Sequence, residues 1–270
     1  MRPYLSTAVM MSVSLWPAAS QQLVVPQRCQ WAIEQLYVPQ RCNNRAHVSC
    51  NATLRDLSNK TLTKEMEAPA SSLMLLIKKF LHGRKEAVPS KFHVVDIGAG
   101  LGMYHVLLHH KLGVEGVESV HTILDRSENG VNRSAGTSHA GYRAAGGFPF
   151  YSSLECATDI AMASGMDDQL WKTLEASPSS LRSLGEGYAD VLMSLVSWMY
   201  HYPEKGYMSF AAKLVRPRTG RLIITPKYQE KAKHELLNAG FSKCEVTKGH
   251  MVCCVGCLSP LARDAAATSR

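Results

Sequence analysis

Residues 92–110, FHVVDIGAGLGMYHVLLHH, constrain the fold of this chain more than any other stretch. A short apolar run containing one acid, Asp96, meets three glycines that alternate with small residues, and an apolar segment of helical character follows. A buried strand that passes through a glycine-rich loop into a helix is typical of α/β proteins, where such loops hold nucleotide-like ligands. The stretch therefore predicts both a fold class and a ligand site.

The rest of the chain alternates strand and helix patterns in the same way. The predicted strands are residues 93–98, 120–125, 189–198 and 220–226, with a closing hairpin over 244–255. The predicted helices are residues 71–83, 102–112, 204–215 and 228–240, and a helix that begins at Ser152 or Ser153 and ends at Gly165. Strands alternating with helices of this length imply a mostly parallel sheet with helices on both faces. Ligands of such sheets lie beyond the carboxyl ends of the strands, where the glycine loop is expected.

The glycine spacing and the position of Asp96 indicate which ligand the loop suits. A dinucleotide fingerprint reads G-x-G-x-x-G, whereas Gly98, Gly100 and Gly102 follow G-x-G-x-G. A carboxylate two residues before Gly98 would repel a pyrophosphate but would suit an ammonium group. Gly98 and Gly100 would also let the backbone approach a ligand closely. S-adenosylmethionine carries an ammonium group and a ribose, so we expect it to be the ligand in preference to another nucleotide.

The segment VVDIGAGLG, residues 94–102, resembles the first motif of the class I S-adenosylmethionine-dependent methyltransferases, and the likeness extends over residues 92–255. This resemblance implies a Rossmann-like α/β fold with a mostly parallel sheet, helices on both faces and a C-terminal antiparallel hairpin. The cofactor-binding residues that it implies in the first motif are Asp96, on the methionine amino group, and Gly98, Ala99, Gly100 and Gly102. The segments TILDRS, FPFYSSLE, DVLMSLVSWMYHYP and GRLII are similar to a smaller group, the bacterial-type sugar O-methyltransferases.

The same resemblance implies an acid at the end of the second strand, which holds the ribose hydroxyls. Glu118 ends VEGVE, but Gly113 and Gly116 make that segment a weak strand. Asp125 ends VHTIL, a continuous run of β-forming residues before a turn. We therefore predict that Asp125 binds the ribose. The third strand is expected near residues 170–176, and no residue stands out for contact with the adenine.

The catalytic region is expected after the fourth strand, in SLVSWMYHYP. Methyl transfer to a hydroxyl needs in-line positioning and removal of the hydroxyl proton, for which a histidine is the usual base. His201 is the candidate base, and Trp198 and Tyr202 are candidate walls for a sugar substrate. The alternative is that His201 only forms a hydrogen bond within the loop before Pro203. We expect the remaining histidines, including the His109–His110 pair, to lie at exposed helix ends.

The N-terminal segment predicts export from the cytosol. Arg2, an apolar run over residues 4–16 and the small residues of 18–20 follow the order of a secretory signal over residues 1–20. The alternatives are an organelle transit peptide, because no acid precedes Glu34, or an ordinary cytoplasmic N-terminus. The expected organisation is a targeting peptide over 1–20, a poorly ordered extension over 21–65, a methyltransferase-like domain over 66–258 and a tail over 259–270.

The eight cysteines do not form a zinc pattern, because CCVGC at residues 253–257 lacks a second paired knuckle. We therefore expect no metal and interpret Cys253, Cys254 and Cys257 as buried structural thiols. Cys29, Cys42 and Cys50 could pair in an oxidising compartment, although one disulfide cannot satisfy all three. No apolar stretch reaches the roughly 18–20 residues that a membrane-spanning helix needs.

The net charge of +8 does not form a basic stripe, so a nucleic-acid partner is not expected. A small-molecule or glycan acceptor is favoured. The rival classes are a nucleic-acid or protein methyltransferase and a non-catalytic cofactor-binding protein of the same fold. The stretch after the fourth strand lacks the Asn/Asp-Pro-Pro-aromatic loop with which the methyltransferases of exocyclic amines resemble one another, which argues against the first rival.

Overall fold

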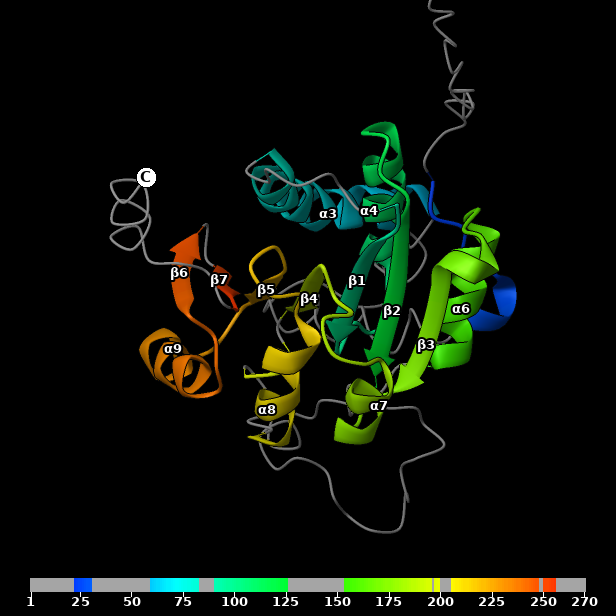
Figure 1. Ribbon diagram of the computed structural model, residues 1–270. Coiled ribbons are helices and arrows are strands. Elements are labelled where there is room, and N and C mark those ends of the chain that lie inside the picture. The colour runs from blue at the N-terminus through cyan, green and yellow to red at the C-terminus, as the bar shows by residue number, and fades with distance from the viewer. Residues whose placement is uncertain are drawn as a thin grey trace, which may run out of the picture.

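The fold is described from a computed structural model of the 270-residue chain (Figure 1). The structure describes residues 22–30, 59–82, 90–125, 153–195, 197–199, 205–247 and 250–255. Residues 1–20, which carry the predicted signal, and the predicted tail over 259–270 lie outside these ranges. In the part of the chain that is described, no helix has the length and apolar character needed to cross a membrane.

The described strands form one seven-stranded sheet in the order β3-β2-β1-β4-β5-β7-β6. The strands are β1 Phe92–Ile97, β2 Ser119–Asp125, β3 Trp171–Glu175, β4 Val191–Ser194, β5 Arg221–Ile224, β6 Lys243–Thr247 and β7 His250–Cys254. The first five run parallel, and β7 pairs antiparallel with both β5 and β6. The order reverses direction between β1 and β4, which makes the carboxyl end of β1 the switch point where such sheets bind ligands. The predicted parallel sheet and closing hairpin are both confirmed.

Helices cover both faces of the sheet, as predicted (Figure 1). The helices are α3 Asn59–His82, α4 Met103–Val114, α6 Leu154–Ala163, α7 Pro178–Ser183, α8 Lys205–Leu214 and α9 Gln229–Asn238, with short 3-10 turns η1 Gln27–Cys29 and η4 Asp168–Leu170. Helices α3, α4 and α6 pack on the face that holds Val94 and Ile123. Helices α7, α8 and α9 pack on the opposite face, which holds Val95 and Leu124. This division follows from the alternation of side chains along each strand.

The predicted extension over residues 21–65 is partly wrong, because α3 begins at Asn59 and not at Ser71. Its first turns belong to the core, and Leu62 is fully buried. The helix also contains Pro69, a residue that normally marks a helix boundary. Contacts from distant segments hold the helix start, since the Thr63 hydroxyl accepts the backbone N–H of Leu23 at 2.9 Å.

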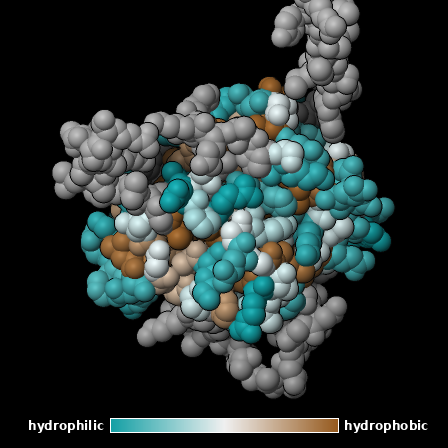
Figure 2. Space-filling view, in the orientation of Figure 1, coloured by the Kyte–Doolittle hydropathy of each residue, from teal (hydrophilic) through white to brown (hydrophobic). Residues whose placement is uncertain are grey.

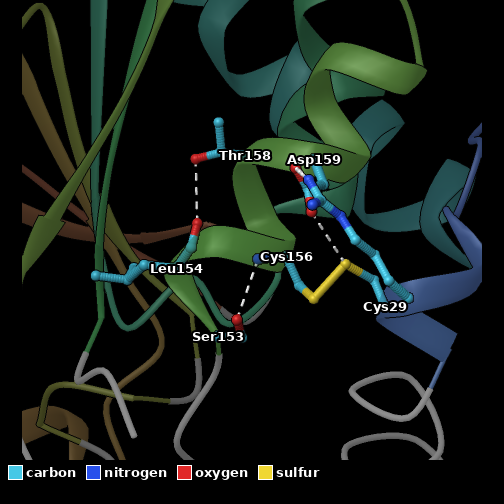
Figure 3. The surroundings of a disulfide bond; sticks show 7 residues. Cys29, Ser153, Leu154, Cys156, Thr158 and Asp159 are labelled. Atoms are coloured by element: carbon cyan, nitrogen blue, oxygen red, sulfur yellow. Dashed lines mark hydrogen bonds and ion pairs between the residues drawn. A yellow bond between two sulfur atoms is a disulfide. The ribbon is translucent and has the colours of Figure 1, made fainter. Parts of the chain in front are cut away.

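Residues 22–30 also belong to the folded domain. Leu23 and Cys29 are fully buried, and a disulfide joins Cys29 to Cys156 on α6 (Figure 3). An ion pair between Arg28 and Asp159 lies beside the disulfide. The segment is therefore fixed to α6 by a covalent bond and by charge, although 127 residues separate the two cysteines.

The interpretation of Cys253 and Cys254 as free buried thiols is wrong. Cys253 on β7 forms a disulfide with Cys244, its partner in the β6–β7 register, and Cys254 is also disulfide-bonded. The third cysteine of that prediction, Cys257, lies outside the described residues. The sequence reading missed the Cys244–Cys253 pair because pairing depends on the register of the hairpin, which spacing alone does not give.

The surface between these elements is mixed. Figure 2 shows hydrophilic residues over much of one face, with apolar residues interspersed among them. The exposed large hydrophobic residues of the described part are Val24, Leu75, Val114, Tyr228, Leu237 and Val246. They are spread over several parts of the fold, and exposed apolar residues of this kind are common on protein surfaces.

Candidate functional site

The glycine loop connects the carboxyl end of β1 to the first turn of α4. Gly98, Gly100 and Gly102 all have positive φ, at 80°, 62° and 63°. Residues with a Cβ adopt this region at a cost, which is why the loop needs glycine at all three positions. The loop is fixed to the neighbouring strand, since the N–H of Gly98 donates to the carbonyl of Leu124 at 2.6 Å.

The three glycines differ in what surrounds them. A Cβ on Gly98 would lie 1.8 Å from Oγ of Ser197, and one on Gly102 would lie 2.8 Å from the Trp171 ring. A Cβ on Gly100 would meet nothing within 4 Å. Gly98 and Gly102 therefore permit close packing within the protein, and Gly100 is the glycine of the loop with open space above it.

Ala99 faces the other way. Its side chain is 8% exposed and packs in the core cluster that also holds Leu101 and Met103. Any contact of Ala99 with a ligand would therefore be made by its backbone.

Asp125 lies at the carboxyl end of β2, next to the glycine loop. Its Oδ2 accepts the backbone N–H of Gly100 at 2.7 Å, and the residue is 7% exposed. The rival acid, Glu118, lies just before the opposite end of β2, where it approaches Lys91 at 3.8 Å. The predicted second strand is confirmed, and of the two rival acids it is Asp125, not Glu118, that lies beside the glycine loop. Its binding of ribose remains a prediction.

Asp96 is fully buried under the first turn of α4. Its Oδ2 lies 2.7 Å from Nε2 of His105 and also accepts the hydroxyl of Tyr104. Its other oxygen, Oδ1, is buried and has no hydrogen-bond partner among the residues that the structure describes. A buried carboxylate oxygen without a partner is costly unless a donor reaches it. An ammonium group would supply such a donor.

A chain of buried polar side chains continues from Asp96. Nδ1 of His105 lies 3.0 Å from Nδ1 of His121, and Nε2 of His121 lies 2.9 Å from the Ser119 hydroxyl. The same hydroxyl lies 2.9 Å from Nδ1 of His109. Burial lowers the pKa of His121 well below its usual value and lowers that of His109 to about 4, so both are neutral at pH 7. The expectation that His109 lies at an exposed helix end is therefore wrong.

The segment after β4 is tied to the end of β1. The Ser194 hydroxyl donates to the carbonyl of Ile97 at 2.6 Å and accepts the N–H of Trp198 at 2.9 Å. These bonds hold the segment so that Ser197 packs directly on Gly98. Sequence reasoning missed Ser197, although it stands in the predicted catalytic stretch.

The predicted substrate residues have different outcomes. Trp198 is 1% exposed and lies in the core. Its ring packs edge-on against the ring of Tyr207, with 6.1 Å between the ring centroids. This packing counts against a role for Trp198 as the wall of an open substrate site. His201 and Tyr202 lie outside the described residues, so their roles stay predictions.

Comparisons with known proteins give a consistent but distant likeness. No family model matches the chain, and no curated protein sequence matches it. Among solved structures, it is similar to the CMeT domain of the citrinin polyketide synthase, with 12% identity, a TM-score of 0.44, and 70% of this chain and 52% of that chain covered. It is also similar to phosphoethanolamine N-methyltransferase 2 of Haemonchus contortus in complex with S-adenosyl-L-methionine, with 13% identity, a TM-score of 0.41, and 65% and 38% covered.

A third similar structure is an arsenic(III) S-adenosylmethionine methyltransferase from Chlamydomonas reinhardtii, with 13% identity, a TM-score of 0.41, and 62% and 64% covered. The chain thus spans about half of the first of these structures and less of the second. Because the identities and TM-scores are low, the assignment of the fold rests on the order and direction of the strands.

Proposed function

We propose that this chain is an S-adenosylmethionine-dependent methyltransferase. The proposal rests on the arrangement at the switch point of the sheet. There the backbone N–H of Gly100, a residue with free space where a Cβ would lie, donates a hydrogen bond to the carboxylate of Asp125. One loop thus offers a close backbone approach beside an acid suited to a diol. One of the similar structures is a complex with S-adenosyl-L-methionine.

The residues of the site fit this cofactor. Oδ1 of Asp96, which has no partner, would accept the methionine ammonium group. Asp125 would take the two ribose hydroxyls, and the backbone of the loop would lie along the rest of the ligand. The residues that hold the cofactor are Asp96, Gly98, Ala99, Gly100, Gly102 and Asp125.

The proposed reaction is O-methylation of a hydroxyl on a sugar or another small molecule. The bound cofactor would supply an electrophilic methyl group on a sulfonium sulfur, and the methyl carbon–sulfur bond would break to leave a neutral thioether. The role of the protein is to align the acceptor oxygen with that methyl group and to exclude water from it. His201 would accept the proton that the hydroxyl loses, so that the bond to the methyl forms as the O–H bond breaks. Tyr202 would contact the acceptor.

Transfer of an isotopically labelled methyl group tests this function. The full chain is incubated with labelled S-adenosylmethionine and a cell extract divided into glycans, small molecules, protein and RNA. Label in the glycan or small-molecule fraction is the expected result. Label in protein or RNA would show that the acceptor is not a glycan or small molecule. Cofactor binding without any labelled fraction would favour a non-catalytic binding protein.

We also propose that residues 1–20 direct the chain into the secretory pathway. The Cys29–Cys156 and Cys244–Cys253 disulfides support this, because such bonds persist in oxidising compartments. N-terminal sequencing of the mature protein tests it. The mature protein should begin near residue 21, and an intact Met1 would contradict the proposal that residues 1–20 are a cleaved signal.

A further inference from the structure

A buried chain of hydrogen bonds leads from Asp96 away from the glycine loop, between α4 and β2. His105 and His109 stand four residues apart on α4, and Ser119 and His121 stand two apart on β2, so each pair lies on one face of its element. His105, Ser119 and His121 are fully buried, and His109 is 7% exposed. The cofactor site described above uses only the first member, Asp96.

The chemistry of the four side chains fixes the direction of every hydrogen bond. A histidine ring that carries a single proton donates one hydrogen bond and accepts another, whereas a carboxylate only accepts. His105 must then donate from Nε2 to Asp96, which leaves its Nδ1 as an acceptor. His121 donates from Nδ1 to that atom, and its own Nε2 accepts the Ser119 hydroxyl proton. Ser119 in turn accepts from Nδ1 of His109.

Every hydrogen in the chain therefore points toward Asp96. This pattern places the donated hydrogens on one oxygen of the Asp96 carboxylate, Oδ2. It also fixes the orientation of the carboxylate, since Oδ2 is held by His105 and Tyr104 while Oδ1 stays without a partner. A neutral imidazole can hold Asp96 in this way only in one tautomer, and His121 is the residue that selects it.

We propose that His105 and His121 are positioning residues for cofactor binding, which hold Asp96 as an oriented carboxylate whose Oδ1 receives the ammonium group. The inference rests on the proposed function. It adds a requirement that the glycine loop alone does not explain, namely a histidine on β2 whose Nδ1 donates to His105. The ligand chemistry concerned is a primary ammonium group, so a ligand without one should not depend on His121.

Two ligands separate this role from a structural one. S-Adenosylmethionine carries the ammonium group, whereas 5′-methylthioadenosine keeps the ribose and adenine but lacks it. Calorimetry with the full chain should show that His121→Leu weakens the binding of S-adenosylmethionine about threefold to tenfold, as expected when a neutral hydrogen bond that orients His105 is lost, and leaves the affinity for 5′-methylthioadenosine within about twofold. His121→Asn, which can still donate near the Nδ1 position, should restore most of the affinity. His93→Leu, on the opposite face of the sheet, is the matched control and should bind both ligands normally.

Side-chain ¹⁵N NMR of the unmodified protein tests the direction of these hydrogen bonds without any substitution. The cofactor complex should show His121 and His109 protonated on Nδ1 and His105 on Nε2. His121 protonated on Nε2 would overturn the inference, and so would equal weakening of both ligands by His121→Leu. If the parent protein bound neither ligand, the proposed function itself would fail, which is a different result from either of these.

Discussion

Replacement of Gly100 by alanine separates the cost of a strained backbone from the cost of a blocked ligand site. The residue has φ of 62°, and an added Cβ would meet nothing within 4 Å. A residue with a Cβ destabilises the folded state by roughly 1–2 kcal/mol when its backbone is in the left-handed region. Alanine also reduces the conformational entropy of the unfolded chain, which offsets roughly 0.4–1 kcal/mol of that destabilisation. Gly100→Ala should therefore lower the free energy of unfolding by only about 1 kcal/mol.

Gly116 provides a matched control. It has φ of 74°, an added Cβ there would also meet nothing within 4 Å, and it follows the last turn of α4, away from the loop. Gly116→Ala should have the same effect on stability as Gly100→Ala, again about 1 kcal/mol. Urea denaturation of the two variants would check this equality.

Ligand affinity should divide the two variants. A methyl group on Gly100 would occupy space that the cofactor needs, and overpacking of this kind costs about 1–3 kcal/mol, which is about a tenfold to hundredfold loss of affinity. Gly116→Ala should leave the Kd for S-adenosylmethionine within about twofold. Isothermal titration calorimetry measures both. Equal affinity in the two variants would refute the claim that the open backbone of Gly100 faces the ligand.

Three further predictions follow from other parts of the molecule. Replacement of both Cys29 and Cys156 by serine should lower the free energy of unfolding by about 3–5 kcal/mol, because the bond closes a loop of 127 residues; a change below about 1 kcal/mol in denaturation would contradict the pairing. The pKa of His109 is about 4 in the folded protein and 6.5 when unfolded, so stability should be unaffected above pH 6.5 and fall by roughly 3 kcal/mol as the pH drops to 4. His109→Gln should remove that part of the pH dependence in denaturation experiments, and an unchanged profile would exclude it. His201→Ala should lower turnover by about 10²–10⁴ with the cofactor Kd unchanged and abolish the rise in rate through the pKa of histidine, whereas a joint loss of stability and affinity would indicate a structural role.

The sheet could be predicted because its signals are local. The strands that flank the glycine loop are short continuous runs of buried residues, and all seven residues of β2 are buried. The choice of Asp125 over Glu118 followed from the same signal, since only residues 119–125 form an uninterrupted β-forming run. The start of helix α6 also has a local signal, because a serine is a favoured N-cap residue and the Ser153 side chain accepts the N–H of Cys156.

The parts that were not predicted depend on contacts between distant segments. The start of α3 lies upstream of Pro69 and is held by residues 22–30, whose pairing with it no local pattern reveals. The disulfide between Cys29 and Cys156 likewise depends on how that segment crosses α6. Tertiary contacts override local preference in both cases.

The sequence contains a partial signal for the buried chain of histidines, namely the spacing of its members along α4 and β2. The spacing of His105 and His109 places both on one face of a helix, and Ser119 and His121 share one face of a strand. Neither spacing states that the two faces meet. Because α4 follows β1 and packs beside β2, the contact arises from the fold, and the polar chain could be recognised only once the fold was known.

A titration of three proteins tests most directly whether Asp125 and the glycine loop bind S-adenosylmethionine. The parent chain, Asp125→Asn and Glu118→Gln are titrated with S-adenosylmethionine and, separately, with NAD. The parent and Glu118→Gln should bind S-adenosylmethionine with equal affinity, and Asp125→Asn should lose roughly 1.5–3 kcal/mol of binding free energy. NAD should bind to the parent more weakly than S-adenosylmethionine. Preferential binding of NAD, or an affinity for S-adenosylmethionine that falls in Glu118→Gln and not in Asp125→Asn, would contradict the proposed role of Asp125 and the glycine loop.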